Sequence, residues 1–187
     1  MHIIAGRHKG RKLFYHQQSG LRPTSARVKE ALFNILGPAI VQESFLDIFA
    51  GCGSVGLEAL SRGADLVAFV EKNGANCKLI ARNLELLNET AQVCHASFEN
   101  ALQLLERQER TFAYIYLDPG YSSDHAKSCL RFLGSSSIIQ GNTIVVAEHS
   151  RREPPPQVIG CLAAYRQAVY GDTALTFYQP TQATDSA

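Results

Sequence analysis

The stretch DIFAGCGSVG, residues 47–56, decides the fold. An apolar segment precedes it and the helix-forming sequence EALSRG follows it, so its glycines stand between an expected strand and an expected helix. Gly51, Gly53 and Gly56 form the pattern G-x-G-x-x-G. Glycines allow the backbone to pass close to a ligand, and the N-terminus of the following helix can hold a negative group. In this context the motif predicts a nucleotide-binding loop of the Rossmann type.

From residue 44 onward the chain repeats the order strand, then helix. Further strands are expected at LVAFVE, AQVC, FAYIYLD and TIVVAE, with helices between them. Such alternation indicates a parallel sheet with helices on both faces. Beyond PPP at 154–156, two apolar segments around Gly171 and Asp172 predict an antiparallel hairpin. We therefore expect an α/β, Rossmann-like fold with a mostly parallel seven-stranded sheet and a C-terminal antiparallel hairpin.

Three parts are expected along the chain. Residues 1–23 alternate apolar and polar positions around glycines, which predicts a small hairpin or extended arm. Residues 24–180 form one domain, whose first helix has Thr24 or Ser25 as a candidate cap. Residues 181–187 are polar and terminal, and we expect them to be disordered.

Charge is unevenly distributed. The first 29 residues carry seven Lys and Arg and no acid, whereas the remainder carries 11 basic and 17 acidic residues and is therefore net −6. This segregation suggests that the N-terminal arm contacts a polyanion. On charge alone, a solvated basic tail explains it equally well.

Composition narrows the class of protein. Of the 187 residues, 45% are hydrophobic and 19% charged, which suits one soluble domain with a core. No apolar run approaches the roughly 20 residues that span a bilayer, and no secretory signal opens the chain. The five cysteines are scattered without a C-x-x-C pair, which favours reduced thiols over disulfides or zinc. We expect a cytoplasmic monomer that binds no metal and no membrane.

Two acids help to identify the ligand of the glycine loop. Glu71 ends the strand after the loop, where a carboxylate can bind ribose hydroxyls. Asp47 lies four residues before the first glycine, where it would repel a pyrophosphate but attract the amino group of a methionine moiety. Asp47 could instead cap a turn, and a nicotinamide or flavin dinucleotide is the competing ligand. Together the two acids favour S-adenosylmethionine.

A second motif, LDPGY at residues 117–121, ends a later apolar strand. Asp118 would face the donor at the carboxyl ends of the strands. Its carboxylate and the Pro119 carbonyl can accept the N–H bonds of an exocyclic amine and turn its lone pair toward the methyl group. Tyr121 offers a face on which an extruded base can stack. Without the glycine loop, an ordinary D-P-G turn would be the better interpretation.

With these motifs in place, the chain resembles the bacterial small-subunit rRNA (guanine-N2) methyltransferases of the RsmD type. The resemblance covers nearly the whole domain: the arm at 3–13, the helix segment at 21–36, the donor motif at 46–64 and the closing hairpin at 170–178. It implies a class I methyltransferase fold with S-adenosylmethionine as donor. The implied substrate is one guanine of 16S rRNA, within the small ribosomal subunit or its assembly intermediates.

The resemblance also implies roles for individual residues. The catalytic residues would be Asp118, Pro119 and Tyr121. The donor would be held by Asp47, Phe49, Gly51, Gly53, Gly56, Glu71, Ser97 and Phe98, the last two beside the adenine. Phosphates of the RNA would contact the basic arm through Arg7, Lys9, Arg11, Lys12, Arg22 and Arg27.

The chain departs from the family at one position. The family usually carries D-P-P followed by Phe or Tyr, and here Gly120 replaces the second proline. Glycine frees dihedrals that proline would fix, so we expect retained activity with a looser loop. Three alternatives remain open: a DNA adenine-N6 or other amino-methyltransferase, a dinucleotide-dependent oxidoreductase, and a non-catalytic RNA-binding assembly factor.

Overall fold

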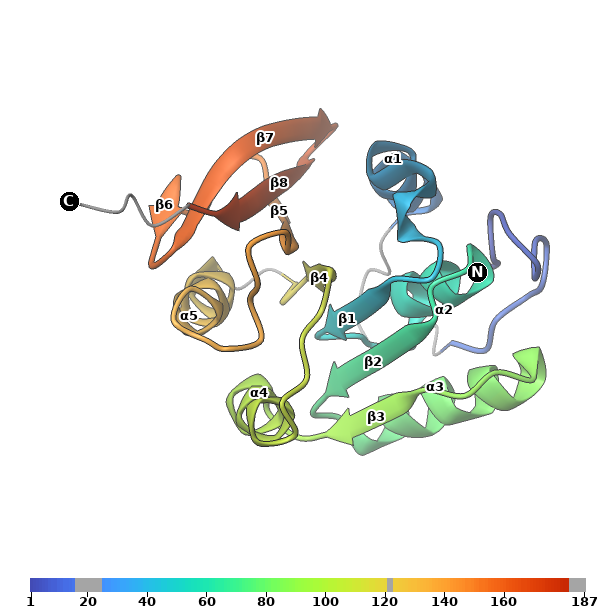
Figure 1. Cartoon of the computed structure of the whole chain (residues 1–187). Helices are drawn as coiled ribbons and strands as arrows, with labels where there is room; N and C mark the ends of the chain where they lie inside the picture. The colour runs from blue at the N-terminus through green and yellow to red at the C-terminus, as the bar shows by residue number, and fades with distance from the viewer. Residues whose placement is uncertain (16–24, 121–122, 182–187) are drawn as a thin grey trace.

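The computed structural model describes residues 1–15, 25–120 and 123–181. Its strands form a single sheet in the order β3-β2-β1-β4-β5-β8-β7-β6, with helices on both faces (Figure 1). The first five strands are parallel, and β8 joins β5 and β7 by antiparallel pairing. The α/β fold with its parallel core and antiparallel closing hairpin is as predicted.

The strands follow the expected apolar segments. They are β1 (Ser44–Ile48), β2 (Leu66–Glu71), β3 (Gln92–His95), β4 (Tyr114–Leu117), β5 (Ile144–Ser150), β6 (Val158–Ile159), β7 (Leu162–Tyr170) and β8 (Thr173–Pro180). The predicted count of seven strands was one too low for the described residues. The additional strand, β6, pairs with the start of β7. Because β6 has only two residues, it leaves no periodic signal in the sequence.

The helices fall into two groups. They are α1 (Ala26–Leu36), α2 (Ser54–Ser61), α3 (Gly74–Leu87), α4 (Phe98–Arg107) and α5 (Ser123–Leu133), with a short 3-10 turn, η1 (Gly37–Ile40), after α1. Side chains of α1, α2 and α3 pack with alternate strand residues such as Phe45, Phe69 and Tyr116. Side chains of α4 and α5 pack with the intervening residues on the other face. The sheet thus has two apolar cores, one on each face.

The first helix shows how local signals define an element. Ser25 caps α1, its Oγ accepting a hydrogen bond from the Val28 amide at 3.2 Å. Gly37 ends the helix with a φ of 65°, and Pro38 cannot continue the α-helical hydrogen bonds. Thr24, the other candidate cap, lies outside the described residues.

The N-terminal segment, here residues 1–15, packs onto the domain. His2 and Lys12 form an antiparallel bridge, and Ile3 and Leu13 are buried in the core beneath α1 and α2. In Figure 1 the segment runs beside α2 and reaches the end of α3. Of the predicted arm, residues 16–23 lie outside the described part of the chain, as do residues 182–187 of the predicted tail.

The strand order reverses between β1 and β4. From β1 the chain moves outward through β2 and β3, and then returns to the other side of β1 to place β4 and β5. In open α/β sheets, ligands bind beyond the carboxyl ends of the strands at such a reversal. The two sequence motifs follow β1 and β4, so both lie at this position.

Candidate functional site

The glycine loop between β1 and α2 is held by backbone geometry that requires glycine. Gly51 and Gly53 have φ values of 57° and 81°, in the left-handed region that favours glycine. Gly56 has a different reason to be glycine: a Cβ there would lie 2.3 Å from the Phe69 ring. The first two glycines therefore shape the loop, and the third lets α2 approach β2.

Two carboxylates fix this loop to the sheet. Asp47 Oδ2 accepts a hydrogen bond from the Gly56 amide at 2.8 Å. Glu71 accepts from the Gly51 amide through Oε2, at 2.8 Å, and from the Asn73 amide through Oε1, at 2.7 Å. Asp47 therefore does act as a cap, as one interpretation of the sequence held, because it accepts an N–H from the first turn of α2. Each carboxylate offers about four acceptor positions and keeps some for a ligand.

Aromatic residues border the same edge of the sheet. Phe49, just after β1, has a φ of 64°, a conformation that is rare and strained for a side chain of this size. Its ring lies 5.5 Å, centroid to centroid, from that of Phe98, which is buried at the start of α4. Ser97 caps α4, with Oγ 3.5 Å from the Asn100 amide. The structure thus brings together Phe49, Ser97 and Phe98, three of the residues predicted to hold the donor.

The second motif forms a tight turn at the end of β4. Asp118 continues the sheet, since its amide donates to the Ile48 carbonyl at 3.4 Å. Its Oδ1 accepts from the Gly120 amide at 3.0 Å. Gly120 has a φ of 71° and a Cβ there would meet nothing within 4 Å. Pro119 lies between them and is half-buried, whereas Tyr121 lies outside the described residues.

Four acids line one face of the sheet at its carboxyl ends. They lie two residues beyond Phe45, Phe69, Tyr116 and Val146, which all face the core beneath α1, α2 and α3. Because side chains alternate along a strand, all four acids face the same side. On neighbouring strands, in order, they are Glu71, Asp47, Asp118 and Glu148. We call them the acidic row.

The acidic row has unusual electrostatics. Burial raises the pKa of Asp47 to about 7, opposed by the Gly56 hydrogen bond and reinforced by the charges of Asp118 and Glu71. Burial also raises the pKa of Asp118 to about 6, opposed by its hydrogen bond from Gly120. Closely spaced carboxylates with raised pKa values are suited to a cationic ligand, since a positive charge would relieve both effects. Among the described residues, no group of His, Cys, Asp and Glu side chains could hold a metal ion.

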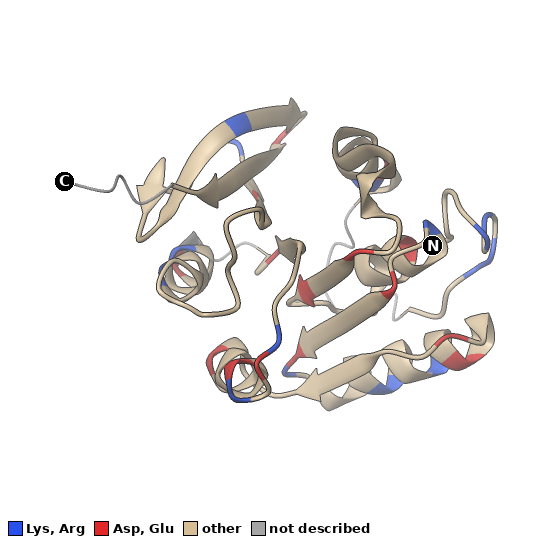
Figure 2. Ribbon diagram, in the orientation of Figure 1, with Lys and Arg blue, Asp and Glu red and all other residues tan. Residues whose placement is uncertain are grey.

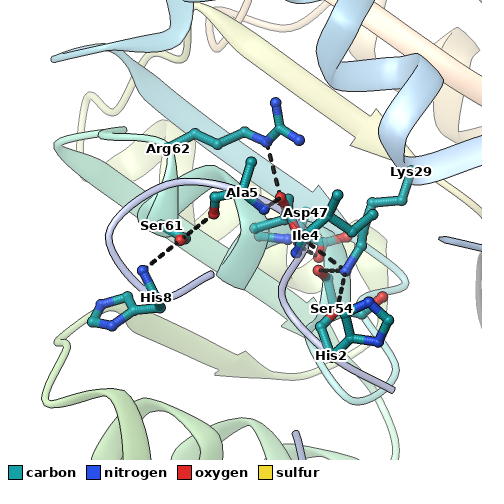
Figure 3. A network of polar contacts seen from close by, with 11 residues as sticks. His2, Ile4, Ala5, His8, Lys29, Asp47, Ser54, Ser61 and Arg62 are labelled. Atoms are coloured by element: carbon teal, nitrogen blue, oxygen red, sulfur yellow. Dashed lines mark hydrogen bonds and ion pairs between the residues drawn. The ribbon is translucent and has the colours of Figure 1, made fainter. Parts of the chain in front are cut away.

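A buried network connects the N-terminal segment to the helix that follows the glycine loop (Figure 3). Its centre is Glu58 of α2, which accepts hydrogen bonds from the amides of Ile4 and Ala5 at 2.8 and 3.0 Å. Lys29 and Arg62 complete it, with nitrogens 3.2 and 2.9 Å from the carboxylate. Lys29 Nζ also lies 3.1 Å from the His2 carbonyl. We call these residues the Glu58 network.

A second buried residue, Asn83 of α3, joins the same segment to the glycine loop. Its amide group exchanges hydrogen bonds with the backbone of Phe14, at 2.8 and 3.0 Å. It also donates to the Cys52 carbonyl within the loop at 3.2 Å. The N-terminal segment is therefore joined to α2 through Glu58 and to the glycine loop through Asn83.

The predicted RNA-binding cations are not equivalent. Lys9, Arg11 and Lys12 are exposed. Figure 2 shows blue stretches, which mark Lys and Arg, along the N-terminal segment. Arg7 is also exposed but pairs with Glu89 at 2.7 Å, and His8 contacts the same carboxylate at 2.6 Å. Arg27 is exposed at the start of α1, and Arg22 lies outside the described residues.

Residues 1–179 match the family described as "Conserved hypothetical protein 95". The chain belongs to this family. It is the RsmD family of S-adenosylmethionine-dependent methyltransferases, and the resemblance noted in the sequence is confirmed.

Relatives of known name extend over most of the chain. "Putative rRNA methyltransferase YlbH" of Bacillus subtilis is 35% identical over 181 residues, covering 96% of this chain and 98% of the relative. "Ribosomal RNA small subunit methyltransferase D" of Escherichia coli is 33% identical over 178 residues, covering 95% of this chain and 88% of the relative. The solved structure of "Putative methyltransferase yhhF from Escherichia coli" superposes with a TM-score of 0.83 at 29% identity, covering 96% of this chain and 97% of that structure's chain.

For this RsmD-family chain, reasoning from the sequence missed two acids. Glu58 looks in the sequence like an ordinary helical glutamate, although it is fully buried. Glu148 lies within TIVVAE, where nothing local shows that it comes beside Asp118. Among the described residues, no helix is long and apolar enough to cross a membrane.

Proposed function

We propose that this protein transfers a methyl group from S-adenosylmethionine to the exocyclic N2 of one guanine in 16S rRNA. The observation that carries the proposal is the position of Asp118, which follows β4 directly beside the glycine loop of β1. The acidic row brings Asp118 of the LDPGY motif onto the same face of the sheet as Asp47 and Glu71, the two acids predicted to bind the donor. Relatives named as small-subunit rRNA methyltransferases support the choice of substrate.

The donor set fits S-adenosylmethionine, which carries a sulfonium and an ammonium group. The ammonium would be held by Asp47, and the ribose hydroxyls would use the acceptor positions that Glu71 retains. Phe49 and Phe98 would lie beside the adenine, and Ser97 next to them. The methionine carboxylate would lie at the glycine loop, where α2 begins.

At the reacting end, the bound donor supplies an activated methyl group, whose bonding electrons stay on sulfur when the carbon–sulfur bond breaks. Asp118 and the Pro119 carbonyl accept N–H bonds from guanine N2 and direct its lone pair toward the methyl carbon. As the nitrogen–carbon bond forms, one N2 proton leaves by way of Asp118 to water. Tyr121 would stack on the extruded base.

The RNA would be held mainly through phosphates. Lys9, Arg11 and Lys12 are exposed on the N-terminal segment, and α3 adds Lys78 and Arg82. Arg82 also stacks over the Phe14 ring, 3.6 Å from its centroid, so the helix and the segment meet at this surface. Such contacts give affinity without base specificity.

The test uses small ribosomal subunits from a strain that lacks this enzyme. The subunits are incubated with labelled S-adenosylmethionine and purified protein, and the labelled nucleoside is identified after digestion of the RNA. We expect N2-methylguanosine from wild type, none from Asp118→Ala, and wild-type yield from the control Asp124→Ala, whose side chain is 92% exposed on α5. Donor binding without methyl transfer by wild type would overturn the proposal and favour an assembly factor.

A further inference from the structure

Glu148 stands level with Asp118 on the neighbouring strand. β4 and β5 are parallel, and Leu117 is paired with Ala147, so the next residues along the two strands are Asp118 and Glu148. Neighbouring strands lie about 4.8 Å apart, and both side chains face the side of the sheet that carries α1, α2 and α3. The acid that would accept the target amine therefore has a second acid beside it.

The Glu148 side chain is held in a defined orientation. Its Oε2 accepts a hydrogen bond from the Tyr116 hydroxyl, which comes from the strand that ends in Asp118. Glu148 has interactions besides this one, and 9% of its surface is exposed. A carboxylate has about four acceptor positions, and the Tyr116 hydroxyl uses one of them.

We propose that Glu148 is a specificity-determining residue that accepts the N1–H of the target guanine while Asp118 accepts from N2. This inference rests on the proposed function. Guanine carries N1–H and N2–H side by side on its Watson–Crick edge, so two adjacent carboxylates meet two adjacent donors. Adenine carries an acceptor at N1. That nitrogen and the Glu148 carboxylate would repel each other, because each would present a lone pair and neither a hydrogen.

The proposal therefore gives a physical reason for guanine rather than adenine as the target. A site that is built to receive an N–H rejects an analogue that lacks it, because the acceptor is then buried without its partner. Asp118 alone would accept an amino group from either base. The choice between the two bases is made by its neighbour.

The test compares two small-subunit substrates, which differ at the nucleotide that the first experiment identifies. One carries guanosine there, and the other carries 2-aminopurine, which keeps the 2-amino group and lacks N1–H. We expect wild type to prefer guanosine by about 10- to 100-fold in kcat/KM, the usual effect of one hydrogen bond to a charged group. For Glu148→Gln we expect the preference to fall to within about threefold, because the amide can donate to N1 of 2-aminopurine.

Two further variants separate recognition from folding. Glu153→Gln makes the same chemical change at an exposed position just beyond β5 and should keep the wild-type preference. Tyr116→Phe removes the hydroxyl that orients Glu148 and should reduce the preference, while donor binding stays normal.

Each outcome has a distinct meaning. Equal losses on both substrates in Glu148→Gln would overturn the inference and make Glu148 a structural residue. Wild type that does not discriminate between the substrates would also overturn it, with the proposed function left standing. Wild type that forms no N2-methylguanosine on guanosine subunits would remove the proposed function and this inference with it.

Discussion

Lys29 and Glu58 form an ion pair in the interior of the protein, with Nζ 3.2 Å from Oε2 and side chains that are 2% and 0% exposed. Burial lowers the pKa of Lys29, while the charge of Glu58 opposes that effect. The pair joins α1 to α2, and through the Glu58 network it fixes the first residues of the chain. The basic segment, which was predicted to be a small hairpin or extended arm, is thus fixed to the core near its start.

Glu58→Gln should destabilise the protein strongly. The change keeps the shape of the side chain but leaves Lys29 buried without its counter-charge, so we expect unfolding free energy to fall by about 3–5 kcal/mol in urea denaturation. Glu30→Gln, on the exposed side of α1, should change it by less than about 0.5 kcal/mol. A loss from Glu58→Gln of the same size as the control would show that the pair contributes little.

Docking of the N-terminal segment can be tested at two glycines. Gly6 and Gly10 both have φ values above 80°, but a Cβ at Gly6 would lie 1.8 Å from the Ser61 carbonyl oxygen, whereas Gly10 has open space. Both alanine variants should lose about 1 kcal/mol because of the backbone conformation. Gly6→Ala should lose at least about 1–3 kcal/mol more from overpacking, measured by thermal or urea unfolding. Equal losses would mean that the segment does not rest on α2 in solution.

Binding of S-adenosylmethionine should release protons near neutral pH. Asp47 has a pKa of about 7 in the free protein, and a cationic ligand beside it favours the ionised form. At pH 7 we expect roughly half a proton to be released, since about half of the Asp47 carboxyls are then protonated. Calorimetric titrations in buffers of different ionisation enthalpy would measure this number. Asp47→Asn should abolish most of the release, and a release that persisted would assign it to another group.

The Asp-Pro-Gly turn should set the acid limb of the activity profile. Asp118 must be ionised to accept the target amine. At saturating S-adenosylmethionine, which keeps Asp47 ionised, its pKa of about 6 predicts that kcat/KM for the RNA falls as pH drops through about 6. Gly120→Pro removes the N–H that lowers this pKa and cannot adopt a φ of 71°, so the acid limb should move to higher pH. Gly120→Ala keeps the N–H and should move it less. If the acid limb lay at the same pH in wild type and both variants, the Gly120 hydrogen bond would not control the ionisation of Asp118 during catalysis.

Cations of the N-terminal segment should control the salt dependence of RNA binding. Replacing Lys9 and Arg11 by Gln should weaken binding and reduce the slope of log K against log salt by about 0.7–0.9 for each phosphate that the variant no longer neutralises. The matched control is Arg107→Gln with Arg110→Gln, at the exposed end of α4 on the other face of the sheet. Filter-binding or fluorescence titrations over a range of salt would compare them. An equal change in both double variants would argue against a specific RNA surface.

Much of the fold could be predicted because its signals are local. Ser25 caps α1 and Gly37 ends it, and each is next to the element that it defines. The glycine loop was recognisable because Gly51 and Gly53 need a left-handed backbone, which glycine adopts at little cost. The same reasoning could not tell that Gly56 is required by the Phe69 ring, since that contact joins α2 to β2.

The site could be predicted in part, and the misses share one physical cause. Asp47, Glu71 and Asp118 each lie at or near the carboxyl end of an apolar strand, so their position was visible in the sequence. Glu58 and Glu148 acquire their surroundings from segments that are far away along the chain: Ile4 for one, and β4 for the other. Arg7, which is predicted to contact RNA, also pairs with Glu89, an acid that is distant in the sequence, and its side chain stays 53% exposed.

Gly120, where a looser loop was expected, adopts one defined conformation. The residue occupies a backbone conformation that proline cannot reach, and its amide closes a hydrogen bond onto Asp118. Glycine therefore gives this turn a donor that the usual proline lacks.

The position of β8 has a consequence for how the protein folds. Residues 173–180 lie between β5 and β7 in the sheet, although both of those strands precede them in the chain. While a nascent chain still lacks these residues, β5 has an open edge of unpaired backbone groups, which is a template for association with other chains. The sheet can close only after synthesis has passed residue 180, so its completion is a late step that depends on a long-range pairing. Chains stalled before that point would be the species for which chaperones and proteases compete.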